Sequence, residues 1–312
     1  KVLGFENDDL LGPTGAVAIP EFNTRFTRQM LIDTQPKDFN TLVRLSGFSH
    51  GTDVWLGNAR ELIVSGTASV LETVGCRDDI MLYLISKGLD PKMSFKIMEA
   101  VRKGKVKKGG FQDGWVEAMQ EHDVPEWYIE SLAKIGYLFP KAHAVAYVMM
   151  AFRIAWFKVH EPLAFYATFF SIRAKAFDAA ECCKDADALR RRIREIENNK
   201  DATAVEQDLM TTLEVCYEFC LRGFHFEPID IYRSDATKFV VTENGLLPPF
   251  TSVRGLGETA ALDTVEKRKG KDFTSVEEFS LCCNKLSQTH IDQLRALGAF
   301  AGLPETSQLT LF

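Results

Sequence analysis

FPKAHAVAYVMMAFRIAWFKVH, residues 139–160, is the stretch on which the fold prediction depends. Its apolar run from Ala144 to Trp156 is interrupted by Arg153. A membrane-spanning helix needs about 20 apolar residues, so the run is too short to predict one, and no membrane is expected as a partner. We predict instead a buried core helix, the first part of a long helix from about residue 142 to 172 with a possible break at Pro162.

The rest of the chain predicts a mainly α fold with a small β element. Residues 1–222 carry helical patterns, among them a helix that opens with Asp90 as its cap and Pro91 in its first turn. Apolar residues then alternate between residues 226 and 250, where Asn244-Gly245 supplies a hairpin turn. Because short helices return up to Phe300, we place the main boundary near residue 223.

Composition limits the classes of function. The net charge of -6 excludes a basic domain that coats nucleic acid by charge alone, so any such contact comes from local patches. Seven cysteines without zinc-ligand spacing indicate reduced thiols in the cytoplasm, with no metal site. Because the chain starts at Lys1 without a signal-peptide pattern, we expect a fragment or a processed chain.

The start of the 139–160 stretch has the chemistry of a nucleotide site. Lys141 and His143 lie at the predicted helix N-terminus, and Tyr147 follows His143 by one turn on the same face. Lysine and the helix dipole favour phosphates, while a tyrosine ring can stack on a base. The alternative is an ordinary helix cap above a core histidine.

A second basic stretch is VRKGKVKKGGFQDGW, residues 101–115. It is predicted to be a flexible segment after a helix, which suits a polyphosphate or a nucleic-acid backbone. The alternative is a solvated surface loop. Its positive residues are Arg102, Lys103, Lys105, Lys107 and Lys108.

VRGLGETAALDTV, residues 253–265, predicts the hairpin of a helix-hairpin-helix element. Gly255, Leu256 and Gly257 lead into a helix, and free amides at such a helix start can hold a DNA phosphate without reading sequence. An ordinary helix connection is the alternative. Residues 273–300 predict a second helical pair, with a glycine-free hairpin near residues 284–287 that packs more than it binds.

The charge around this tandem element is mixed. We expect weak, strongly salt-dependent DNA binding from it, because neighbouring acids cancel much of its positive charge. The positive residues are Arg254, Lys267, Arg268, Lys269 and Lys271.

These stretches, in this order, resemble the C-terminal part of the bacterial replicative DNA polymerase III alpha subunit, and most closely the PolC type of low-GC Gram-positive bacteria. The resemblance covers essentially the whole chain. The stretches that carry it are GPTGAVAIPEFNTRFTRQML, SGFSHGTDVWLGNA, YLFPKAHAVAYVMMAFRIAWFKVHEPL and the tandem helix-hairpin-helix element.

The resemblance implies three domains: polymerase fingers in residues 1–222, a β element with the duplex-binding tandem in 223–303, and a sliding-clamp-binding tail in 304–312. It implies that Lys141, His143 and Tyr147 line the pocket for the incoming deoxynucleoside triphosphate. Ser49 and His50 would lie near the same cleft. The residues expected to face the triphosphate or the template are Arg102, Lys103 and Lys105.

The tail ends in QLTLF, which matches the bacterial clamp-binding pentapeptide. The alternative is a tail folded back on its own core. The residues that would contact the clamp, the beta subunit, are Gln308, Leu309, Leu311 and Phe312. Other implied partners are primer-template DNA and further replisome subunits, at the nucleoid.

Chemistry in that family needs Mg²⁺ held by an acidic triad in a palm domain upstream of these motifs. We therefore assign no catalytic residue and no metal ligand here, including the pairs Asp8-Asp9 and Asp78-Asp79. The chain alone is not expected to polymerise. The rival hypothesis is a non-catalytic, clamp-tethered DNA-binding or repair accessory protein.

Overall fold

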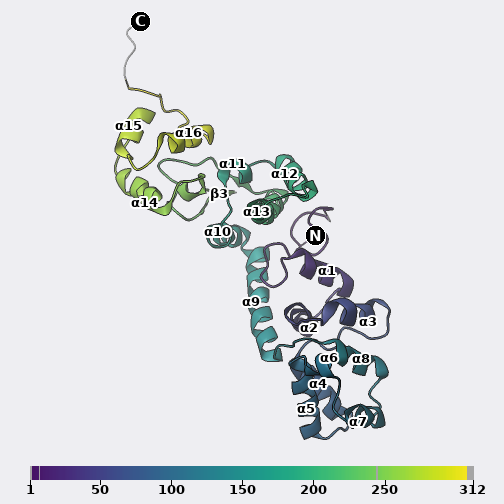
Figure 1. Ribbon diagram of the computed structural model, residues 1–312. Coiled ribbons are helices and arrows are strands. Elements are labelled where there is room, and N and C mark those ends of the chain that lie inside the picture. The colour runs from purple at the N-terminus through teal and green to yellow at the C-terminus, as the bar shows by residue number, and fades with distance from the viewer. Residues whose placement is uncertain (1, 7, 244, 308–312) are drawn as a thin grey trace. The chain divides into compact units, whose positions relative to one another are not determined.

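The computed structural model describes residues 2–6, 8–243 and 245–307. The chain forms two compact units: one comprises residues 18–155, and the other joins the segment before residue 18 to everything from Trp156 onward. Helix α9 (Lys141–His160) passes through the boundary between them (Figure 1). The mainly α fold class is confirmed, with a small sheet in the second unit.

The unit of residues 18–155 is helical. Polar side chains fix its helix starts; the carboxylate of Asp90, for example, accepts from the amide of Met93 at 2.8 Å just before Pro91, as predicted. Its elements before α9 are α1 (Arg25–Thr34), α2 (Phe39–His50), the irregular turn η1 (Trp55–Ala59), α3 (Arg60–Val64), α4 (Arg77–Ser86), α5 (Pro91–Arg102), α6 (Lys105–Gly109), α7 (Trp115–Glu121) and α8 (Glu126–Lys134).

The second unit holds the remaining helices and the sheet. Its helices are α10 (Pro162–Ile172), α11 (Ala179–Cys182), α12 (Ala186–Asn198), α13 (Ala204–Leu221), η2 (Phe250–Ser252), α14 (Glu258–Lys267), α15 (Val276–Cys282) and α16 (Gln288–Ala296). Strand β2 (Val240–Val241) pairs antiparallel with β3 (Gly245–Leu247), as the predicted hairpin requires, and β1 (His225–Phe226) pairs parallel with β3. Asn244 itself lies outside the described residues.

Helix α9 ends before Pro162, so the predicted break is confirmed, but the prediction of a buried core helix is wrong. Only a narrow row that includes Ala144, Val148 and Ala151 is buried, because these small residues recur at helical spacing on one face. The larger side chains are exposed, namely Met149, Met150, Phe152, Trp156 and Phe157. Within the described part of the chain, α9 alone is long and apolar enough to cross a membrane, a criterion that single helices of non-membrane proteins also meet.

The division into units does not fall at residue 223. Aromatic rings pack across that position: Phe226 of β1 lies 4.8 Å from Phe219 of α13 and 5.3 Å from Phe170 of α10, between ring centroids. Phe177 and Phe239 extend the same cluster, 4.8 Å apart. The change of composition near residue 223 therefore marks a change of secondary structure within one packed unit, and the functional domain ranges stay predictions.

A buried lysine fastens the N-terminal segment to the helices of the second unit. The side chain of Lys158 is 2% exposed, and its ammonium donates to the carbonyl oxygens of Gly15 (2.8 Å) and Val17 (2.6 Å). It also pairs with the carboxylate of Glu218 at 2.7 Å, which accepts a further bond from the Tyr166 hydroxyl at 2.7 Å. Three helices and the N-terminal segment thus share one buried polar network.

We predict that Lys158→Met lowers the free energy of unfolding by about 3–5 kcal/mol, because it leaves the Glu218 carboxylate buried without its counter-charge. Urea denaturation of the whole chain measures the loss. The double variant with Glu218→Gln is expected to recover part of it. A loss below about 1 kcal/mol for the single variant would show that the pair contributes no more than a surface ion pair.

Candidate functional sites

The C-terminus of α2 and the N-terminus of α9 bring together three of the residues expected in the nucleotide pocket. The ring of His50 lies 5.5 Å from that of His143 and 6.0 Å from that of Tyr147. His143 is also 4.5 Å from Tyr147 and stacks on Phe139 at 4.9 Å. Because Tyr147 is 40% exposed, its ring keeps a free surface on which a base could stack.

A carboxylate holds the His50 ring in place. His50 Nε2 contacts the carboxylate of Glu21, a residue whose backbone has a positive φ of 71°. The neighbouring Ser49 is half-buried, and its hydroxyl donates to the carbonyl of Ser46 in its own helix at 3.0 Å. Ser49 therefore lies next to this ring cluster, but its hydroxyl is hydrogen-bonded within α2.

The start of α9 is tied to α4. The backbone N–H of Lys141 donates to Asp78 at 2.7 Å, and the Lys141 ammonium lies 3.9 Å from Asp79. Asp79 in turn pairs with Arg44 at 2.7 Å and accepts from the amide of Cys76 at 2.8 Å. The side chain of Lys141 stays 38% exposed, so a phosphate can still reach its ammonium.

The acidic pairs do not fit a magnesium site. Asp78 and Asp79 cap helix starts and pair with cations, and Asp8 and Asp9 pair with Arg190. Among the described residues, no group of three or more His, Cys, Asp or Glu side chains could hold a metal ion.

The basic stretch is more ordered than predicted. Lys105–Gly109 forms the short helix α6, which Gly104 opens with a φ of 65° and which Val106 anchors by burial. Glu99 pairs with Arg102 and, at 2.7 Å, with Lys103, and these bonds lower the pKa of Glu99 to about 2. The prediction of a flexible segment is wrong because local glycine geometry and a buried valine fix it.

Two other lysines of this stretch differ in their surroundings. Lys107 pairs at 2.6 Å with Asp53, the last residue of the SGFSHGTD stretch. Lys105 is exposed, and its ammonium has no partner among the described residues. Of the three basic residues expected to face a triphosphate, Lys105 is thus the one whose charge is not already paired.

The loop of residues 135–139 joins all these stretches. Its Tyr137 exchanges backbone bonds with Thr52, and its Leu138 amide donates to the Arg102 carbonyl at 3.2 Å. Gly104 approaches Gly136 so closely that a Cβ on Gly104 would lie 2.3 Å from the Gly136 carbonyl oxygen. Segments that are 32 to 85 residues apart in sequence therefore meet at one place within the 18–155 unit.

A pocket of about 350 Å³ lies beside Lys141 and is lined partly by Arg44, Tyr83 and Tyr128. Sequence analysis did not single out these residues. The signal for Arg44 was weak, since it is a lone arginine whose bonds go to Asp79 and to the carbonyls of distant residues such as Leu71. Only the fold places it next to Lys141.

The predicted tandem is formed in the second unit with one difference. The second pair is α15 and α16, joined through residues 283–287 as predicted. In the first pair the leading helix is only the single 3₁₀ turn η2, three residues long. Gly255 then turns with a φ of 80°, buried Leu256 anchors the hairpin, and exposed Gly257 caps α14.

Three of the basic residues around this hairpin already form bonds within the structure. Lys267 bonds to Asn284 (2.6 Å) and Asp263 (3.0 Å), and Lys269 pairs with Glu266. Arg268 donates to the Ile231 carbonyl at 2.8 Å, and burial lowers its pKa. Arg254 and Lys271 are exposed, and neither side chain forms a hydrogen bond or ion pair among the described residues, so these two and the hairpin amides are still available to a phosphate.

The residues expected to contact a clamp lie outside the described residues; they are Gln308, Leu309, Leu311 and Phe312. The preceding segment is attached to the tandem. The carbonyls of Pro304 and Glu305 accept from the amides of Val276 (2.9 Å) and Glu277 (3.0 Å), and the Glu305 side chain pairs with Arg295 at 2.9 Å. The Thr306 hydroxyl also donates to Glu277 at 2.9 Å, so the predicted tail of residues 304–312 starts with residues that are bonded to the tandem.

Comparison with known proteins gives two family matches. Residues 6–123 match the finger domain of the bacterial DNA polymerase III alpha subunit, and residues 223–309 match a helix-hairpin-helix motif. The chain is 51% identical to the PolC-type DNA polymerase III of Halalkalibacterium halodurans, 51% to that of Bacillus cereus and 49% to that of Bacillus subtilis. Between 99% and 100% of the chain is covered, but only 21% of each of these relatives, so the chain spans about a fifth of their length.

We predict that Gly104→Ala destabilises the chain, because an L-residue at φ 65° costs about 1–2 kcal/mol and the new Cβ would meet the Gly136 carbonyl. A fall in Tm measures the effect. Gly109→Ala in the same short helix is the matched control, since a Cβ there meets nothing within 4 Å. Equal Tm values for the two variants would contradict the close approach.

Proposed function

Because the chain is homologous along its whole length to about a fifth of PolC-type DNA polymerase III, we propose that it forms the nucleotide-binding, duplex-binding and clamp-binding part of a replicative DNA polymerase. The observation that carries the proposal is that His50, at the end of α2, lies with His143 and Tyr147 at the start of α9, where Lys141 is also found. The match of residues 6–123 to a polymerase finger domain disfavours the rival accessory protein, which needs no triphosphate pocket.

The group suits an incoming deoxynucleoside triphosphate. The ammonium of Lys141 offers a mobile positive charge to the phosphates, and Lys105 offers a second one from the adjoining α6. The exposed ring of Tyr147 offers a stacking surface for the base, while Glu21 and Phe139 hold His50 and His143 in position. Arg102 and Lys103 would face the triphosphate or the template strand while each remains paired with Glu99.

The part played by these residues is positioning and electrostatic stabilisation. In the complete polymerase the primer 3′-hydroxyl attacks the α-phosphate of the triphosphate, and pyrophosphate leaves. Mg²⁺ would supply charge neutralisation at the reacting phosphate when bound by carboxylates elsewhere in the longer protein. The residues of this chain hold the substrate and do not ligate that metal.

The tandem would hold the primer-template duplex. The exposed amides around Gly255 and Gly257 and the guanidinium of Arg254 can bind one backbone phosphate without reading sequence. The tail after residue 305 would bind the sliding clamp and keep the polymerase at the replisome on the nucleoid, in the cytoplasm. A short segment with a few apolar anchors typically gives modest affinity.

We predict that Lys141→Ala combined with His143→Ala in the intact polymerase raises the KM for deoxynucleoside triphosphates about tenfold or more, since hydrogen bonds to charged groups contribute about 1.5–3 kcal/mol. Steady-state primer extension measures it. Lys92→Ala, an exposed lysine at the start of α5, is the control and should leave KM unchanged. An unchanged KM for the double variant would remove both residues from the pocket.

We predict micromolar binding of the chain to a bacterial sliding clamp, lost on deletion of residues 308–312. Calorimetric titration measures both. Phe312→Ala should abolish binding, whereas Thr310→Ala, which is assigned no contact, should retain it. Absence of binding by the full chain would make the tail something other than a clamp ligand, and the polymerase proposal would then depend on the first 222 residues.

A further inference from the structure

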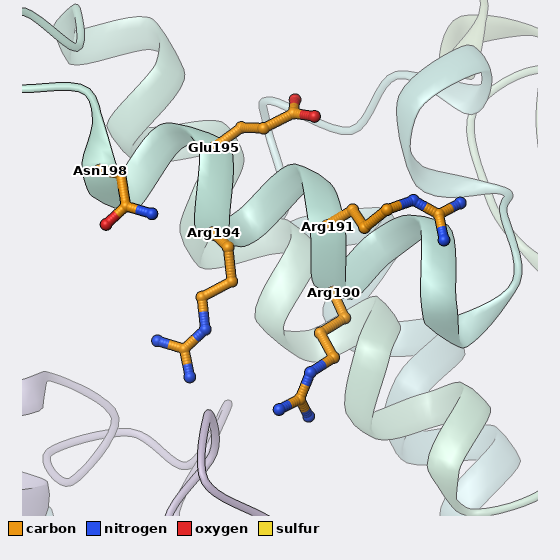
Figure 2. Close-up of a pocket in the computed structure, with 5 residues that line it drawn as sticks. All are labelled: Arg190, Arg191, Arg194, Glu195 and Asn198. Carbon is orange, nitrogen blue, oxygen red and sulfur yellow. The ribbon is translucent and has the colours of Figure 1, made fainter.

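Helix α12 carries a face of arginines that the proposed function does not use. Arg190, Arg191 and Arg194, with Glu195 and Asn198, line an open pocket of about 330 Å³ (Figure 2). Arg192 does not line this pocket and pairs instead with Glu181 at 3.0 Å. We call the five residues of the pocket the α12 arginine face.

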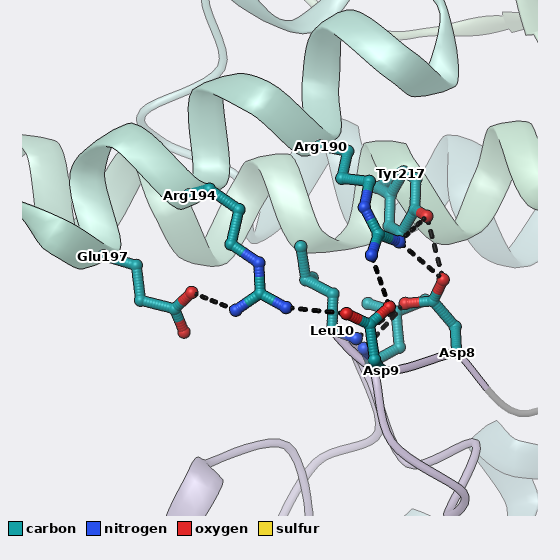
Figure 3. A network of polar contacts seen from close by, with 8 residues as sticks. Asp8, Asp9, Leu10, Arg190, Arg194, Glu197 and Tyr217 are labelled. Carbon is teal, nitrogen blue, oxygen red and sulfur yellow. Dashed lines mark hydrogen bonds and ion pairs between the residues drawn. The ribbon is translucent and has the colours of Figure 1, made fainter.

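Part of this face already holds anions. Arg190 contacts the carboxylates of Asp8 (3.1 Å) and Asp9 (2.5 Å), and Arg194 contacts Asp9 at 3.0 Å (Figure 3). The hydroxyl of Tyr217 donates to Asp8 at 2.9 Å. Two neighbouring carboxylates thus bridge two guanidinium groups one helical turn apart, so the face can accept two anionic groups in succession.

The two aspartates are held very differently. The Asp8 side chain is 13% exposed and also accepts from the amides of Leu10 and Leu11 at 2.8 and 3.1 Å, which makes it part of the fold. The Asp9 side chain is 62% exposed, and its side-chain contacts are those with the two arginines. Ion pairs this exposed contribute little to stability, so a stronger anion can displace Asp9 at small cost.

Further donors on the face are unused. Arg191 is exposed, and its guanidinium has no partner among the described residues. The amide of Asn198 is likewise exposed, at the other end of the pocket from Arg191 (Figure 2). When Asp9 moves away, Arg190 keeps its bond to Asp8 and Arg194 keeps its pair with Glu197 at 2.7 Å, so each frees the terminal nitrogen that held Asp9. The planar guanidinium of Arg191 adds a full set of donors in the geometry that suits phosphate oxygens.

We propose that the α12 arginine face binds the phosphate backbone of DNA, with Asp9 as the carboxylate that the phosphates displace. A polyanion is favoured over an acidic protein segment because each phosphate that it places on an arginine releases condensed counterions, a gain that a single side-chain carboxylate lacks. This inference depends on the proposed function only in that the chain meets DNA. The face lies in the same compact unit as the Gly255–Gly257 hairpin.

Fluorescence anisotropy of the whole chain with a labelled 20-base-pair duplex and with a single strand, over a salt series, tests the proposal. Arg191→Glu should weaken binding about tenfold at low salt and reduce the slope of log K against log salt by about 0.9. The fold should not change, because Arg191 is exposed and its guanidinium forms no hydrogen bond or ion pair among the described residues. Whichever DNA, duplex or single strand, loses more affinity in this variant is the one whose backbone the face binds.

Arg173→Glu is the matched control, since Arg173 is an exposed arginine of the same unit whose side chain forms no hydrogen bond or ion pair among the described residues. Asp9→Asn should have the opposite effect and tighten binding about two- to threefold, whereas Asp113→Asn, an exposed acid of the other unit, should not. Equal losses for Arg191→Glu and Arg173→Glu would overturn the proposal.

A hairpin variant, Arg254→Glu, separates this inference from the proposed function. Loss of DNA binding in Arg254→Glu with wild-type binding in Arg191→Glu would leave the polymerase proposal standing and overturn the α12 site. A wild-type chain that binds neither form of DNA would overturn both. The expected result is that Arg254→Glu and Arg191→Glu both weaken DNA binding and that Asp9→Asn binds DNA more tightly than the wild type.

Discussion

A buried ammonium is the constraint on which the second unit depends. Lys158 sits at 2% exposure, where an unpaired charge would be very unfavourable, so its surroundings must supply oxygen atoms from several directions. They come from the backbone of Gly15 and Val17 and from Glu218, segments separated by 141 to 143 and by 60 residues of sequence from the lysine. Satisfying one charge therefore fixes where the N-terminal segment, α9 and α13 meet, and that placement also brings Asp8 and Asp9 to α12.

The candidate nucleotide site depends on a different kind of contact, in which two backbone segments approach each other closely at glycine residues. Gly104 lies against Gly136, and Gly47 against Gly75, where a Cβ would meet the opposing carbonyl oxygen at 2.3 Å in both cases. These contacts pull the basic stretch, the end of α2 and the start of α4 toward the loop that precedes α9. Side chains at the site are then held by acids, as His50 is by Glu21.

Several basic residues that sequence motifs assign to phosphate binding are neutralised within the fold, by Glu99, Asp263 and Glu266. Lys105, Arg191 and Arg254 are exposed and form no ion pair among the described residues, so they stay available to an outside anion. A chain with a net charge of -6 can therefore bind nucleic acid only through such local groups, with the strong salt dependence that this implies.

Sequence alone determined the local features: the mainly α fold, the capped start at Asp90, the hairpin before Gly245 and the chemistry of Lys141, His143 and Tyr147, because each depends on neighbours within a few residues. It could not show that the apolar side chains of α9 are exposed, that Glu99 neutralises Arg102, or that Asp9 meets Arg194. Those outcomes follow from which surfaces the tertiary fold buries and which distant charges it pairs. Tertiary packing therefore decided which of the residues singled out by sequence remain free to meet a ligand.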